Sequence, residues 1–149
     1  MRVQNNTLKN HFKSHKSGDP IIGQGERLAT KLLVKLFPND MIATQVPFKQ
    51  LLSPVYQADI GHRALLETLD IVVFREDDYP IVVRIQDDRH KTKTFGILDE
   101  RQRVELEASD CYVVDVFKYE APALFKEKNI GRAELELKAL LADYLPNLQ

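Results

Sequence analysis

Three stretches of the chain carry apolar residues at the spacing of an amphipathic helix. Leucines recur on one helical face over residues 25–36, and Pro38 follows where that helix must end. A second pattern predicts a helix over 96–109, with Ile97, Val104 and Ala108 on its apolar face. The last predicts a helix over 132–145, whose apolar stripe comprises Leu135, Leu137, Leu140, Leu141 and Leu145.

Four other short runs are rich in β-branched and aromatic residues, which is typical of strands. They cover 41–46, 69–75, 80–86 and 111–117. The first three strands follow one another without a long helix between them, so we expect an antiparallel meander. The helix between the third and fourth strands acts as a crossover that makes the fourth parallel to its neighbour. The predicted fold class is therefore α/β, an αβββαβ core with a mixed four-stranded sheet flanked by helices.

The pattern divides the chain into a short polar segment and one domain. Residues 1–20 hold four cations and one acid, which predicts either a frayed tail or a basic arm lying along a phosphate backbone. Residues 21–149 read as a single domain. Within it, residues 47–67 are too long for a turn, and we expect a partly helical excursion. This segment is equally compatible with a specificity loop, a homodimer contact or filler.

Composition narrows the classes of protein. The chain has 149 residues, a net charge of −1 and one cysteine, Cys111, which lies in an apolar strand and is expected to be inert core packing. No apolar run is long enough to cross a bilayer, so we expect no membrane partner and a cytoplasmic location. Because the net charge is close to zero, any surface that binds nucleic acid must be a local basic patch.

The element order and several residues together resemble one known superfamily. Glu26 lies on the first helix and Asp70 on the second strand, within Leu-Asp-Ile. The apolar third strand leads to His90, and Asp99 near the start of the next helix precedes Leu106. From Glu26 to Phe117 the chain resembles the PD-(D/E)XK nucleases, in particular their very-short-patch-repair-endonuclease-like branch. That resemblance implies a restriction-endonuclease-like fold and nucleic acid, DNA in the first place, as the partner.

The resemblance also implies a site. In the family, carboxylates from adjacent strands hold Mg²⁺, which polarises a phosphodiester and activates water. Carried onto this chain, the catalytic positions are Glu26, Asp70, Arg84 and Gln86, and the metal ligands would be Asp70 and Asp88. The residues expected to contact nucleic acid beyond the third strand are Arg89, His90, Lys91 and Lys93.

Two of these positions depart from the family pattern. Arg84 and Gln86 stand where the family has a glutamate followed by an aspartate or lysine. A guanidinium is permanently positive, and a unit-charge pair ~4 Å apart at an effective dielectric near 20 interacts by about 4 kcal/mol. A cation beside Arg84 would therefore be repelled, and we expect Arg84 to pair with Asp70 instead. The substitution Gln86 is milder, since an amide oxygen is a ligand for hard cations.

Two functions remain open from the sequence. In the first, the chain is a nuclease-like protein whose site is inactivated, so that it serves as a nucleic-acid-binding or assembly module without catalysis. In the alternative, it is a Mg²⁺-dependent endonuclease or nickase with a variant site. Single residues keep two interpretations as well: Glu26 as a solvated charge or a site accessory, His90 as loop packing or part of the site, and Asp99 as a charge at a helix start or part of the site.

Overall fold

The computed structural model describes residues 25–59, 67–86, 93–126 and 128–146. The predicted basic segment 1–20 lies outside these ranges. The elements in chain order are α2 (Glu26–Leu36), β1 (Met41–Pro47), α3 (Phe48–Leu51), α4 (Pro54–Asp59), β2 (Thr68–Phe74), β3 (Ile81–Gln86), α6 (Lys93–Ala108), β4 (Tyr112–Phe117), α7 (Pro122–Lys126) and α8 (Ile130–Leu140).

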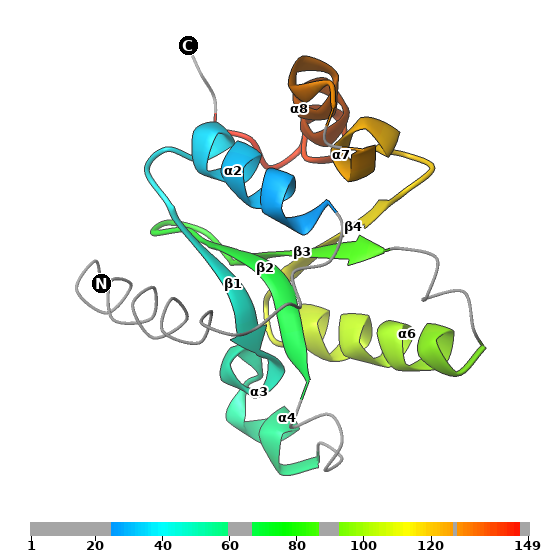
Figure 1. The fold of residues 1–149 in the computed structure, drawn as a ribbon. Helices are drawn as coiled ribbons and strands as arrows, with labels where there is room; N and C mark the ends of the chain where they lie inside the picture. The colour runs from blue at the N-terminus through cyan, green and yellow to red at the C-terminus, as the bar shows by residue number, and fades with distance from the viewer. Residues whose placement is uncertain (1–24, 60–66, 87–92, 127, 147–149) are drawn as a thin grey trace, which may run out of the picture.

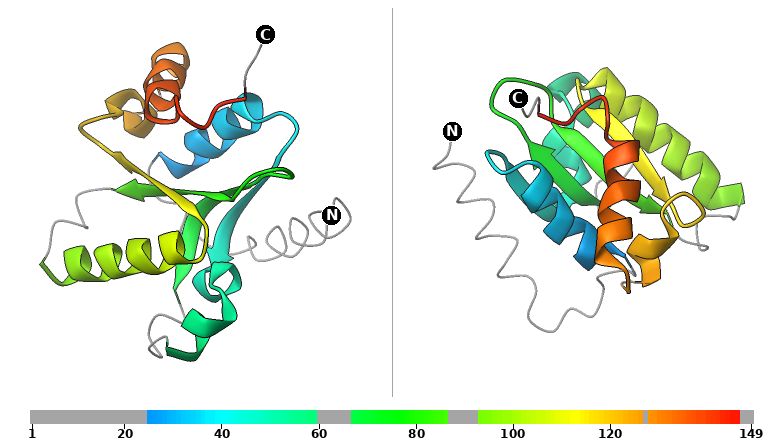
Figure 2. Two further views of the ribbon diagram at one scale, coloured as in Figure 1. Left: turned by 180° about the vertical axis from the view of Figure 1, so that it is seen from behind. Right: turned by 90° about the horizontal axis from the view of Figure 1, so that it is seen from above.

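The four strands form one mixed sheet in the order β1-β2-β3-β4. The first three strands pair antiparallel, and β4 runs parallel to β3, as the connections predict. Helices α2, α7 and α8 lie on one face of the sheet, and α6 lies on the other with α3 and α4 (Figures 1 and 2). The class and the strand arrangement expected from the sequence are therefore confirmed.

Successive side chains of the central strands point to opposite faces of the sheet, so the hydrophobic core consists of two layers. Ile71 and Val73 of β2 point to the face covered by α2, whereas Val72 points to the face where Leu106 of α6 packs. All four side chains are fully buried. Since β3 is buried along its whole length, a polar residue on it must find its partners inside the protein.

The helices show where the sequence prediction succeeds and fails. Helix α2 begins within one residue of the predicted start, after Gly25, whose φ of 89° places it in the left-handed region. Two of the three residues predicted for the apolar face of α6 were wrong: Val104 is 56% exposed and Ala108 is exposed, while Leu106 is buried. The side chain of the third, Ile97, lies outside the described residues. The predicted start was also wrong, because α6 begins at Lys93 and Asp99 lies inside the helix.

The C-terminal region differs from prediction in two ways. Leu135, expected in the apolar stripe of α8, is 68% exposed, whereas Leu137 of the same stripe is buried as predicted, together with Ala133. Helix α7 was not predicted, and it packs its three buried residues against α2 and α8. None of the helices in the described ranges combines the length and the apolar character needed to cross a membrane.

Candidate functional site

Three polar residues meet on the α6 face of the sheet. Arg84 and Gln86 of β3 are each only 5% exposed, and the parallel register sets Arg84 beside Asp115 of β4. Arg84 donates from Nε to Asp115 Oδ1 at 2.6 Å and from Nη2 to Oδ2 at 2.9 Å. This bidentate pair is the strong geometry for a guanidinium and a carboxylate. We call Arg84, Gln86, Gln102, Arg103 and Asp115 the Arg84–Asp115 cluster.

Asp115 is the acceptor at the centre of the cluster. Besides the two bonds from Arg84, Oδ1 accepts from Gln86 Nε2 at 3.2 Å and Oδ2 accepts from Arg103 Nη2. A carboxylate offers about four lone-pair sites, so four donors fill them. Burial raises the pKa of Asp115, but hydrogen bonds and charge from Arg84, with smaller contributions from Gln86 and Arg103, outweigh burial and hold this pKa below its usual value. The carboxylate is therefore ionised and fully engaged.

Helix α6 completes the cluster. Gln102 accepts a bond from Arg84 Nη1 at 3.3 Å and donates to Glu67 Oε2 at 3.0 Å, just before β2. Arg103, whose side chain is 28% exposed, comes from the next position of the same helix. The cluster thus connects three consecutive elements of the chain: β3, α6 and β4.

Asp70 lies at the same end of the sheet but has a different role. Strands β2 and β3 pair over Ile71–Val73 and Ile81–Val83, and the antiparallel register sets Asp70 opposite Arg84 just beyond that stretch. There, Asp70 Oδ2 accepts a hydrogen bond from the backbone N–H of Ile85 at 2.8 Å. The carboxylate therefore satisfies a backbone donor where the strands stop pairing.

Glu26 belongs to a second polar chain at this end of the sheet. It is 4% exposed, so its interpretation as a solvated charge was wrong. Its Oε1 accepts from Gln45 Nε2 at 2.7 Å, and Gln45 Oε1 accepts from Thr68 at 2.9 Å. Gln45 has a φ of 53°, a conformation that is uncommon for a residue other than glycine. Its side chain thereby joins α2 to β2.

The structure brings together Asp70, Arg84 and Gln86 as the sequence predicts, but the expected pairing needs correction. The bidentate partner of Arg84 is Asp115, not Asp70. Asp115, Gln102 and Arg103 were missed as site residues. A usable signal existed for Asp115, because an ionised carboxylate in an apolar strand demands a buried partner. The predicted residues Asp88, Arg89, His90 and Lys91 lie outside the described residues, as do the side chains of Lys93 and Asp99.

These residues are a poor set of ligands for Mg²⁺. All acceptor positions of Asp115 are filled, Asp70 already accepts one backbone bond, and Arg84 adds a fixed positive charge between them. Within the described ranges, no group of three or more His, Cys, Asp and Glu side chains could hold a metal ion. One acceptor stands apart: Gln86 Oε1 is buried and has no hydrogen-bond partner.

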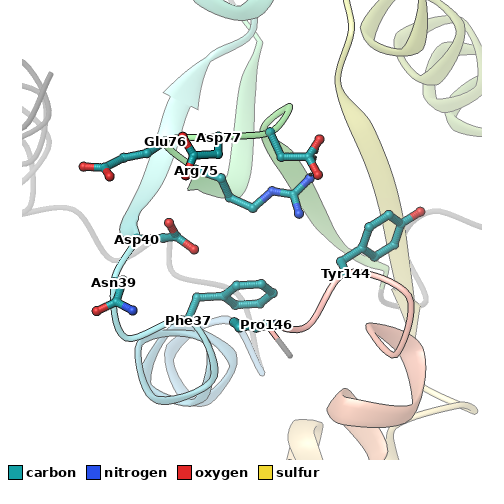
Figure 3. A pocket seen from close by; sticks show the side chains of 9 residues that line it. Phe37, Asn39, Asp40, Arg75, Glu76, Asp77, Tyr144 and Pro146 are labelled. Carbon is teal, nitrogen blue, oxygen red and sulfur yellow. Dashed lines mark ion pairs between the residues drawn. The ribbon is translucent and has the colours of Figure 1, made fainter. Parts of the chain in front are cut away.

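A surface cavity lies at the opposite end of the sheet, between the α2–β1 and β2–β3 connections (Figure 3). Its volume is about 520 Å³. Phe37, Tyr144 and Pro146 form apolar parts of the wall, and four acids surround Arg75: Asp40, Glu76, Asp77 and Asp78. Burial raises the pKa of Asp40; Arg75 offsets part of this, and the charges of Glu76 and Asp77 raise the pKa further. This end of the molecule is therefore acidic.

Comparison of the chain with models of known protein families, with curated proteins and with solved structures gives no match.

Proposed function

We propose that this chain is a protein of restriction-endonuclease-like fold that binds nucleic acid without cleaving it. The observation that carries the proposal is the pair between Arg84 and Asp115. The resemblance to PD-(D/E)XK nucleases calls for a metal-binding carboxylate at the strand position of Arg84. A buried ion pair with Asp115 occupies that position instead. A divalent ion at that position would have to displace the guanidinium of a side chain that is 6% exposed. That guanidinium donates to Asp115 from two nitrogens and to Gln102 from the third.

The cluster gives the fold a structural use for its former catalytic positions. The pair is desolvated, so removing either partner leaves a buried charge, which costs about 3–5 kcal/mol. Arg84, Asp115 and the α6 residues Gln102 and Arg103 hold the helix to the sheet by hydrogen bonds. Among the α6 side chains that the structure describes, those of residues 100–108, Leu106 is the one that is fully buried. The polar network therefore adds hydrogen bonds between α6 and the sheet to the packing of Leu106.

Nucleic acid is proposed as the ligand from the resemblance and from local charge. The sequence places Arg89, Lys91 and Lys93 directly after β3, at the end of the sheet where the family binds its scissile phosphate. Since the whole chain has a net charge of −1, binding would depend on such local cations and weaken steeply with salt.

One observation favours the alternative, a Mg²⁺-dependent endonuclease or nickase with a variant site. Gln86 Oε1 is a buried acceptor without a partner, and an amide oxygen is a ligand that hard cations accept. In that alternative Asp70, Gln86 and Asp88 would hold the ion, with Glu26 as an accessory. A single carboxamide beside a guanidinium offers much less charge than two carboxylates, which is why the non-catalytic function is preferred.

The test measures binding and cleavage on the same sample. Fluorescence anisotropy with a labelled DNA duplex at low salt should give saturable, salt-sensitive binding. Supercoiled plasmid and the same duplex should stay intact in millimolar Mg²⁺ or Mn²⁺. Cleavage or nicking that disappears in Asp70→Asn would establish the enzyme and reject the proposal. Absence of binding to DNA and RNA would reject both functions.

A further inference from the structure

Helix α2 exposes a row of cations that the site leaves unused. Arg27, Lys31 and Lys35 recur every four residues, and with Val34 they form the exposed side of the helix. The buried side consists of the apolar residues of α2 together with Glu26. No acid therefore lies on the exposed side of this helix. We call Arg27, Lys31 and Lys35 the α2 basic row.

Two members of this row are free to bind an external anion. Arg27 and Lys31 have no ion-pair partner among the described residues, and both are exposed. Lys35 is engaged by Glu134 of α8, from Nζ to Oε1 at 2.7 Å, and the same carboxylate lies 3.9 Å from Lys138. Glu134 therefore offsets the charge of Lys35 and Lys138 only, and the charges of Arg27 and Lys31 leave the exposed side of α2 net positive.

The spacing of the row suits a regular polyanion. With a rise of 1.5 Å per residue, cations four residues apart are offset by about 6 Å along the helix, and the row spans about 12 Å. Duplex DNA carries one charge per about 1.7 Å of axis, so roughly seven phosphate charges lie alongside that length. A single exposed apolar residue, Val34, interrupts the polar side, which gives an apolar partner little to bury.

The position of the row agrees with the proposed function. Glu26, the residue before Arg27, is bonded to Gln45, which stands at the same end of the sheet as Asp70 and Gln86. The four acids around the cavity lie beyond the other end of α2, where they would repel phosphates (Figures 1 and 3). The charge therefore falls from positive to negative along α2, and a polyanion is drawn toward the Arg27 end.

We infer that the exposed face of α2 is a docking surface for the phosphate backbone of duplex nucleic acid, with Arg27 and Lys31 as its main contacts. This inference rests on the proposed function and adds the surface that would carry it. This surface lies on α2, which covers the opposite face of the sheet from α6 (Figure 2).

The test compares two charge-reversed proteins of equal net charge. Arg27→Glu with Lys31→Glu reverses the row, and the second substitution sets an acid four residues before Lys35, which is a favourable helical pair. Lys49→Glu with Lys128→Glu is the matched control, since both lysines are exposed and belong neither to α2 nor to the strand ends of β3 and β4. Circular dichroism and thermal melts should show both variants folded.

Duplex binding, followed by anisotropy over a range of salt, should weaken by at least about tenfold in the α2 variant. The slope of log K against log salt should flatten by about 0.9 for each phosphate that is no longer neutralised, close to 1.8 for two. The control should keep the wild-type slope.

An unchanged slope in the α2 variant, with the wild type still binding, would overturn this inference and leave the proposed function standing. Failure of the wild type to bind any duplex would overturn both. Binding to vesicles of anionic lipid without binding to a duplex would assign the row to a membrane surface and also overturn the inference.

Discussion

Arg84 and Asp115 are joined by two hydrogen bonds across neighbouring parallel strands, with Nε–Oδ1 at 2.6 Å and Nη2–Oδ2 at 2.9 Å. Both side chains are nearly inaccessible to water, at 6% and 11% exposure. The energy of such a pair depends on both partners being present, because each compensates for the desolvation of the other. This relationship decides how the site should respond to mutation.

A double-mutant cycle tests the pair. Arg84→Ala and Asp115→Ala should each lower the free energy of unfolding by about 3–5 kcal/mol, because each leaves an uncompensated buried charge. The double variant should lose much less than the sum of the two, giving a coupling energy of about 1–3 kcal/mol. Urea titration followed by circular dichroism gives all four free energies.

The control for this cycle is a pair on the surface of α6. Arg101 and Glu105 are 3.2 Å apart, and the arginine is well exposed. Exposed pairs four residues apart contribute only about 0.3–0.5 kcal/mol, so the same cycle at these positions should give a small coupling. Additive losses at Arg84 and Asp115 would mean that the two side chains do not meet in solution.

The ionisation of Asp115 should make the free energy of unfolding depend on pH. The pKa of Asp115 is lower in the folded protein than in the unfolded chain, where it is near 3.9. The ionised carboxylate therefore stabilises the fold fully when the pH is above the unfolded-state pKa, and this stabilisation is lost as the pH falls through the folded-state pKa. Wild-type protein should therefore lose stability more steeply below pH ~4 than Asp115→Asn, whose amide does not titrate. Urea midpoints measured from neutral to acidic pH compare the two slopes, and parallel curves would contradict the assignment.

The sheet could be predicted from sequence because its signals are local. Four runs of β-branched residues and short connections determine an antiparallel meander with a parallel fourth strand, and the structure confirms this order. The buried faces of α6 and α8 were predicted less well, because Val104 and Leu135 are exposed. An apolar residue on such a helix is buried only if another element covers it, and nothing near it in the sequence reveals that coverage.

The sequence predicts that Asp70 of β2 lies close to Arg84 and Gln86 of β3. It does not predict that Arg84 pairs with Asp115. The turn between β2 and β3 sets their register, so Asp70 could be placed opposite Arg84 from the sequence. The register of β4 depends on how helix α6 packs as a crossover, and that packing is not encoded locally. Asp115 therefore remained a strand residue in the sequence and became the partner of Arg84 only in three dimensions.

The acidic cavity predicts an opposite effect of pH at Asp40. Because its pKa is raised in the folded protein, ionisation above the unfolded value near 3.9 favours the unfolded state, and stability falls as the pH rises. Asp40→Asn should therefore raise the melting temperature at neutral pH, and this gain should vanish in acid where Asp40 is protonated. Asp143→Asn, at an exposed position outside the cavity, serves as the control and should change little.

Titration with Mg²⁺ tests the proposed loss of the metal site. A ligand that binds the folded protein stabilises it by mass action, by about 2.7 kcal/mol at a hundred times its dissociation constant, and so raises its melting temperature. Because Arg84 sets a fixed positive charge beside Asp70 and the acceptors of Asp115 are filled, millimolar Mg²⁺ should give no more stabilisation than the same ionic strength of NaCl. Arg84→Glu places a carboxylate where the PD-(D/E)XK pattern has one, and it measures how far the guanidinium prevents Mg²⁺ from binding. It should be destabilised without metal, since two carboxylates then face each other at β3 and β4, and it should recover part of that loss when Mg²⁺ is added. A rise in the melting temperature of the wild type that Asp70→Asn abolishes would instead place a metal beside Asp70 and support the nuclease.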